Sequence, residues 1–105
     1  MIFRRRRFAD LIQRQLDVFA ADQAHDVFVE IRERKEAYDR ADRDEAEELY
    51  GDYIDAVETG TEALADMRDR FKHTLDEDAA EEYELEFNRA VKKRWTMFGL
   101  EIDLR

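Results

Sequence analysis

The 105-residue chain contains no proline and only three glycines. Because proline and glycine nucleate most turns and interrupt helices, a chain without them has few places for strands, tight turns or long loops. Charged and hydrophobic side chains each make up 44% of the sequence, a balance typical of amphipathic helices. The composition therefore predicts an all-α protein.

Cysteine is absent as well, which excludes disulfides, thiolate catalysis and sulfur-ligated metals. The purely apolar runs are a few residues long, far below the roughly 20 residues that cross a bilayer. The stretch from Met1 to Phe8 begins like an export signal, but polar residues follow where the apolar part of a signal peptide should run. We therefore expect a soluble, cytoplasmic protein with one domain over residues 1–105.

Charge is unevenly distributed along the chain, which has a formal net charge of −10. Residues 1–14 sum to +4 and residues 83–105 to +1, whereas residues 15–42 sum to −4 and residues 43–82 to −11. Both ends are therefore basic and the middle is strongly acidic. Such a surface keeps a protein soluble, and it reflects the general composition of the source proteome more than a particular function.

The clearest helix is predicted from Asp44 to Leu75. Its apolar residues step by three and four positions, which is a heptad seam. They are Tyr50, Tyr53, Val57, Gly60, Leu64, Met67, Phe71 and Thr74. Gly60 lies on this seam, so it either permits a close helix approach or ends one helix before the next begins.

A second helix is predicted to begin at the capping-box sequence Thr74-Leu75-Asp76-Glu77. Basic residues at positions 92–94 complement the negative end of the helix dipole, and Gly99 is the expected stop. In the first third, apolar spacing from Phe8 to Tyr38 suits one long helix up to the Arg40 region. Alternating residues leave short strands open at 26–31 and 100–104.

Two long helices and a shorter one predict an antiparallel three-helix bundle. A helix of about 30 residues is about 45 Å long, so a shorter third helix cannot cover the whole length of the pair. We therefore expect a homodimer to complete the bundle.

No catalytic, nucleotide or cofactor motif is present, so we expect neither an enzyme nor a bound cofactor. Glu45, Glu48, Asp52 and Asp55 line one predicted helix face and could gather a divalent cation, but a solvated face is the favoured interpretation and we assign no metal site. The histidines His25 and His73 lack the Glu-x-x-His spacing of di-iron bundles. The tyrosines are expected to pack in the core.

The basic segment at residues 1–7 is the strongest sequence signal for a polyanion. Four adjacent guanidinium groups beside apolar residues could bind nucleic-acid phosphates or an anionic membrane surface. They belong to Arg4, Arg5, Arg6 and Arg7. The net charge opposes both targets, so the favoured interpretation is that these arginines pair with the acidic middle of the chain, either within the bundle or across a dimer.

Residues 99–105 form a candidate recognition tail. A short apolar tail can add to a partner's sheet edge or fill a groove, or it can fold back over the end of its own bundle. The candidate partner-binding residues are Trp95, Phe98, Leu100, Ile102 and Leu104.

The sequence thus predicts a small acidic helical protein that acts through protein–protein contact. It would be a homo-oligomeric scaffold or an adaptor whose acidic face meets a basic protein partner. The alternatives are a nucleic-acid or anionic-membrane binder and, less favoured, a carboxylate-rich metal-binding protein.

Overall fold

A computed structural model describes residues 7–105, apart from the side chains of residues 23–25. Its α-helices are α1 (Ala9–Gln23), α2 (Val29–Asp39), α3 (Ala46–Lys72), α4 (Glu77–Arg94) and α5 (Gly99–Ile102). A π-helical turn (Ala24–Phe28) joins α1 to α2, and a 3-10 turn (Thr96–Phe98) precedes α5. Within the described residues there is no strand, so the predicted all-helical class is confirmed and the alternative strands are absent.

The predicted count of three helices is not confirmed, because five α-helices are present between residues 7 and 105. The long helix expected in the first third is divided by the π-helical turn. Such a turn holds one more residue than an α-turn and so rotates the face that the next helix presents. Here it brings Val27 against α3 and the Phe28 ring to 5.8 Å from the Phe19 ring. Beyond α4, the tail adds the fifth helix.

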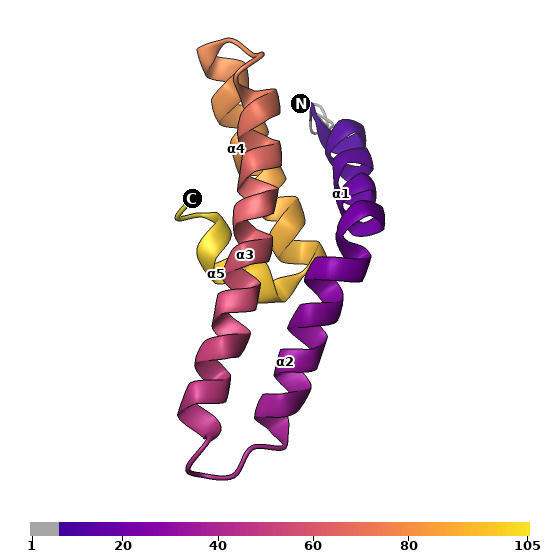
Figure 1. Ribbon diagram of the computed structural model, residues 1–105. Helices are drawn as coiled ribbons and strands as arrows, with labels where there is room; N and C mark the ends of the chain where they lie inside the picture. The colour runs from indigo at the N-terminus through magenta and orange to yellow at the C-terminus, as the bar shows by residue number, and fades with distance from the viewer. Residues whose placement is uncertain (1–6) are drawn as a thin grey trace.

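The longest helix, α3, is the spine of the molecule, and different helices accompany its two halves (Figure 1). Its first half pairs with α2, and the loop that joins them lies at one end of the molecule. Along its second half, α3 contacts α4 and α5, and α1 packs against α4. The result is an elongated molecule of 56 × 27 × 22 Å.

The hydrophobic core lies where α1, α3, α4 and the C-terminal segment meet. Its fully buried members include Leu16, Leu64, Phe87 and Phe98. α3 passes through Gly60 without interruption, and a Cβ atom at this position would lie 2.8 Å from Cε1 of Phe98. The helix break considered at Gly60 is therefore absent, and the space left by this glycine is filled by the side chains of Phe98 and Val27 and not by a closely approaching helix.

The helix α4 begins and ends a few residues away from the predicted positions. Its N-cap is Asp76, whose side chain accepts a hydrogen bond from the backbone N–H of Ala79 at 2.9 Å. Its last residue is Arg94, and Trp95 is extended, with φ −135° and ψ 90°. Gly99 was the expected stop, but it has helical backbone angles and begins α5. The extended Trp95 turns the chain so that its indole reaches the rings of Phe19 and Phe28.

Candidate interaction surfaces

The C-terminal segment folds back onto α3 and α4, and this divides the five candidate partner-binding residues. Phe98 and Ile102 are completely buried in the protein's own core, and Trp95 is half-buried. Leu100 and Leu104 remain 86% and 78% exposed. Since Phe98 and Ile102 are four residues apart, as are Leu100 and Leu104, one side of this short segment faces the core and the other faces solvent.

Arg68 holds this segment in place, and sequence reasoning missed it. Its side chain is only 1% exposed. Nη1 donates to Asn88 Oδ1 at 2.9 Å and to the Ile102 carbonyl at 3.2 Å, and Nη2 donates to the Arg105 carbonyl at 2.6 Å. Nε pairs with Asp69 at 2.9 Å. The sequence feature that could have indicated its burial is its position one helical turn after Leu64, on the apolar stripe of α3.

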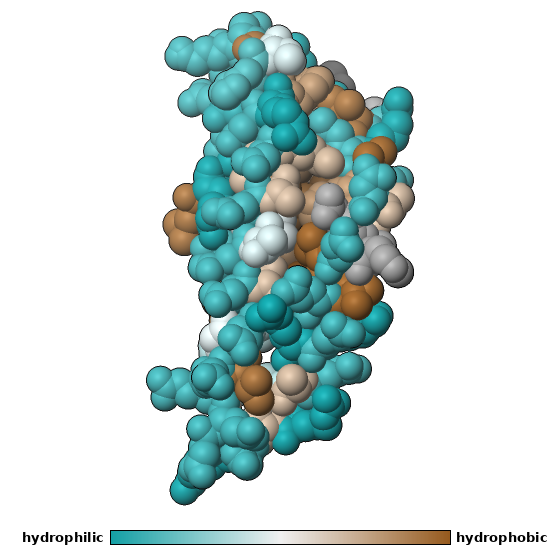
Figure 2. All heavy atoms as spheres, viewed as in Figure 1, coloured by the Kyte–Doolittle hydropathy of each residue, from teal (hydrophilic) through white to brown (hydrophobic). Residues whose placement is uncertain are grey.

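Residues 32–55 form a two-helix projection that we call the arm. It consists of most of α2, the connecting loop and the first turns of α3, and none of its side chains is buried. Its hydrophobic side chains are half-buried between the two helices, and Tyr50 is 47% exposed. On the face drawn in Figure 2, hydrophobic side chains are visible between α2 and α3 at this end of the molecule. Local contacts hold the arm together, including the Tyr38 and Tyr50 rings at 5.2 Å.

The exposed side of the arm carries the row of carboxylates that the sequence singled out as a conceivable cation site. Within residues 7–105, no group of three or more acidic or histidine side chains is arranged to hold a metal ion. In the same part of the chain, no hydrogen bond or ion pair reaches these carboxylates. The row consists of Glu45, Glu48, Asp52 and Asp55. Near the row, Arg34 donates a hydrogen bond to the backbone carbonyl of Asp52 at 3.2 Å.

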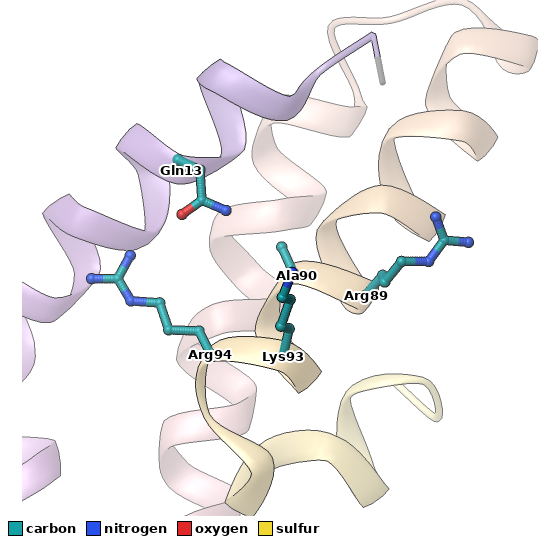
Figure 3. A pocket seen from close by; sticks show the side chains of 5 residues that line it. All are labelled: Gln13, Arg89, Ala90, Lys93 and Arg94. Carbon is teal, nitrogen blue, oxygen red and sulfur yellow. The ribbon is translucent and has the colours of Figure 1, made fainter. Parts of the chain in front are cut away.

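A basic groove lies between α1 and α4, at the other half of the molecule. It has a volume of about 420 Å³ and is lined by Gln13, Arg89, Ala90, Lys93 and Arg94. Figure 3 shows Arg94 extending toward α1 and Arg89 extending away from it. Arg94 donates to Asp17 at 2.7 Å and lies 4.9 Å from the Trp95 ring. In the described part of the chain, Arg89 and Lys93 have no hydrogen-bond or ion-pair partner.

The polyanion-binding prediction falls mostly outside the described residues, since Arg4, Arg5 and Arg6 precede them. Arg7 is described and is exposed. Its guanidinium lies 3.9 Å from Glu82 on α4 and 5.2 Å from the Phe8 ring. This contact joins Arg7 to an acid of α4, not to the arm.

The tyrosines are divided between the core and the arm. Tyr83 is completely buried, and its hydroxyl donates to Gln15 Oε1 at 2.8 Å. Burial raises the pKa of Tyr83 to about 12, although the hydrogen bond to Gln15 acts in the opposite direction. Tyr38, Tyr50 and Tyr53 instead form a partly exposed aromatic cluster on the arm. His73 is exposed at the C-terminal end of α3.

No protein-family model, curated protein or solved structure matches the chain. Across the described residues, none of the helices combines the length and the apolar character needed to cross a membrane. The surfaces of the chain itself are therefore the basis on which a function is proposed.

Proposed function

We propose that this protein acts by binding other protein chains, and that it self-associates through the arm as a homo-oligomeric scaffold. The observation that carries the proposal is the absence of any buried side chain from residue 32 to residue 55. Elsewhere along α3, side chains such as Val57, Leu64 and Ala65 are buried by neighbouring helices.

The arm is the part of the fold that lacks a covering layer. An amphipathic helix gains most of its stability by burying its apolar face, and an isolated helical hairpin covers only part of two such faces. The half-buried residues of the arm include Leu49, Tyr53 and Ile54. Tyrosine contributes disproportionately to protein interfaces, because it buries a large rigid ring at low entropic cost and keeps a polar tip. A second chain would supply the missing layer.

Measurement of the solution mass over a range of protein concentrations tests this proposal. We expect the mass to rise from monomer toward dimer. In parallel, hydrogen exchange of the arm amides should slow at high concentration, because association closes local openings. The amides of Leu64 to Arg68 on α3 are the internal control, since they lie in the core, outside both the arm and the basic groove, and should not change. A monomer at every concentration, with unchanged exchange in the arm, would contradict the proposal.

A second candidate function is suggested by the basic groove. Arg89 and Lys93 have no partner within residues 7–105, so their charges are available to phosphate groups. The test is retardation of single-stranded and duplex nucleic acid, and sedimentation with anionic vesicles, at low salt. This candidate predicts binding that weakens steeply with salt and is lost in Arg89→Ala/Lys93→Ala. If neither target binds at low salt, this function is excluded.

A further inference from the structure

We propose that the basic groove between α1 and α4 receives the acidic row of the arm from a second copy of this chain. This inference rests on the proposed self-association and adds to the apolar contact of the arm a charged contact, whose two surfaces it specifies. Opposite charges on the two surfaces and the lack of partners for both carry it.

The groove offers cations that the fold leaves without partners. Arg89 and Lys93 are exposed and one helical turn apart on α4, and Arg89 extends away from α1, so it would reach a ligand from the outer side of the groove. Arg94 beside them is already held by Asp17 and the Trp95 ring, which fixes one wall of the groove. Ala90, the smallest of the lining side chains, lies between Arg89 and Arg94 (Figure 3).

The arm offers the matching anions. Glu45, Glu48 and Asp55 are exposed, and Asp52 is half-buried. Ten residues of helix separate the two ends of this row, which corresponds to about 15 Å. Two bases one turn apart span about 6 Å, so the row is long enough to present carboxylates to both of them.

The two surfaces cannot meet within one chain. The arm is built from α2, the loop and the first turns of α3, whereas the groove is formed by α1 and α4 beside the second half of α3. Figure 1 shows the loop of the arm at the opposite end of the molecule from the start of α1. Arg89 and Lys93 therefore cannot reach this row within one chain, whereas those of a second copy can.

Charge also decides between the two ways in which copies could pair. The arm contains ten acidic and five basic residues, so arm-to-arm pairing would bring together two surfaces of net charge −5. Arm-to-groove pairing brings together opposite charges. If the molecules lie antiparallel about a twofold axis, each arm meets the partner's groove, and the assembly closes as a dimer.

A charge-swap experiment tests the pairing. The groove variant is Arg89→Glu/Lys93→Glu, and the arm variant is Glu48→Lys/Asp55→Lys. Each variant alone should lose the dimer, because the groove variant places acids against the acidic row and the arm variant places two lysines against the basic groove. A mixture of the two should form a mixed dimer, since the unchanged arm fits the unchanged groove and the two reversed surfaces fit each other. A chain carrying all four changes should dimerise with itself.

A general repulsion between chains of high net charge would not produce the dimer in the mixture. The groove variant has a net charge of −14 and the arm variant −6, so the mixed dimer has the same total charge as the dimer of the original chain, which is −10 per copy. The control for the arm variant is Asp66→Lys/Glu81→Lys, two exposed acids elsewhere, and the control for the groove variant is Arg70→Glu. Both controls should remain dimeric.

The outcomes separate this inference from the proposed function. If the original chain is monomeric at all concentrations, the proposed self-association fails and the inference fails with it. If the original chain is dimeric but the arm and groove variants also remain dimeric, self-association stands and the arm-to-groove pairing is wrong. Recovery of the dimer in the mixture supports both.

Discussion

At the scale of single residues, Arg68 has the least solvent exposure of any charged side chain among the described residues and is the link between α3 and the C-terminal segment. A buried guanidinium is stable only when its donors are satisfied, and here they are directed at three acceptors besides Asp69. Two of those acceptors are backbone carbonyls of the C-terminal segment. The position of the tail therefore depends on one side chain.

We expect Arg68→Met to lower the free energy of unfolding by about 3 kcal/mol, because the buried acceptors lose their donor and are not replaced. Denaturant unfolding measures this loss. Asp69→Asn is the control, since Asp69 is 42% exposed and its ion pair should contribute less than about 1 kcal/mol. Equal stability of Arg68→Met and the original chain would mean that these hydrogen bonds do not hold the tail.

Gly60 and Gly51 provide a matched pair of substitutions on one helix. Gly60→Ala should destabilise the protein by about 1 kcal/mol, because overpacking against Phe98 and Val27 outweighs the better helix propensity of alanine. Gly51→Ala should instead stabilise it by up to about 1 kcal/mol, since nothing lies within 4 Å of the added Cβ. Thermal and denaturant unfolding distinguish the two signs. A stabilised Gly60→Ala would contradict the tight contact with Phe98.

Tyr83 should make stability depend on alkaline pH. Its pKa is raised to about 12 in the folded protein from the ordinary value of 10.0, so the folded state retains the proton longer than the unfolded state. The contribution of Tyr83 to the free energy of unfolding is complete below pH 10 and is lost as the pH rises from 10 to 12. Tyr83→Phe should reduce this loss in denaturant unfolding measured across that range. An unchanged pH profile in Tyr83→Phe would assign the loss to other groups.

At the scale of elements, the helices with strong local signals were predictable and the turns between them were not. The heptad seam and the acidic start and basic end of α4 are local patterns, and both helices are present. The π-helical turn and the return of the tail depend on contacts between distant residues. Arg68 and Arg105 are 37 positions apart, and Tyr83 and Gln15 are 68 apart. Periodicity does not report such contacts.

The difference between local patterns and distant contacts also explains which candidate surfaces could be identified from the sequence. The exposed carboxylates of α3 follow from helical spacing, so the sequence located them. The groove between α1 and α4 depends on how two helices separated in sequence pack, so the sequence did not indicate it. The tail residues were identified as a group because they are neighbours in sequence, but burial of Phe98 and Ile102 divides them.

Removal of the Asp76 and Asp42 side chains should have different effects, because Asp76 caps a helix of the core and Asp42 stabilises the turn that precedes α3 in the arm. Asp76 caps α4, and Asp42 accepts from the backbone N–H of Glu45 at the start of α3. Asp76→Ala should lower the global free energy of unfolding by about 1 kcal/mol. Asp42→Ala should mainly speed hydrogen exchange in the arm, because that region can open without unfolding the rest. Similar global losses in both variants would show that the arm unfolds together with the core.

At the scale of the whole molecule, the arm accounts both for the elongated shape and for much of the negative charge. The radius of gyration is 16.1 Å, compared with about 13 Å for a compact domain of this size. An extended shape leaves more surface per residue, and here much of that surface is acidic. The ten acids of the arm lie close together on two helices and the loop between them, so their repulsion opposes the fold of the isolated chain.

Salt should therefore raise the unfolding temperature of the monomeric protein, measured by circular dichroism at a concentration below self-association. Screening weakens the repulsion of a chain with a net charge of −10, and most of its ion pairs are exposed enough to contribute little that screening could remove. The variant Glu48→Lys/Asp55→Lys should show a smaller rise, because its net charge is −6 and its arm repels itself less. A fall in unfolding temperature with added salt would mean that attraction between opposite charges, and not repulsion between acids, dominates the electrostatics of the single chain.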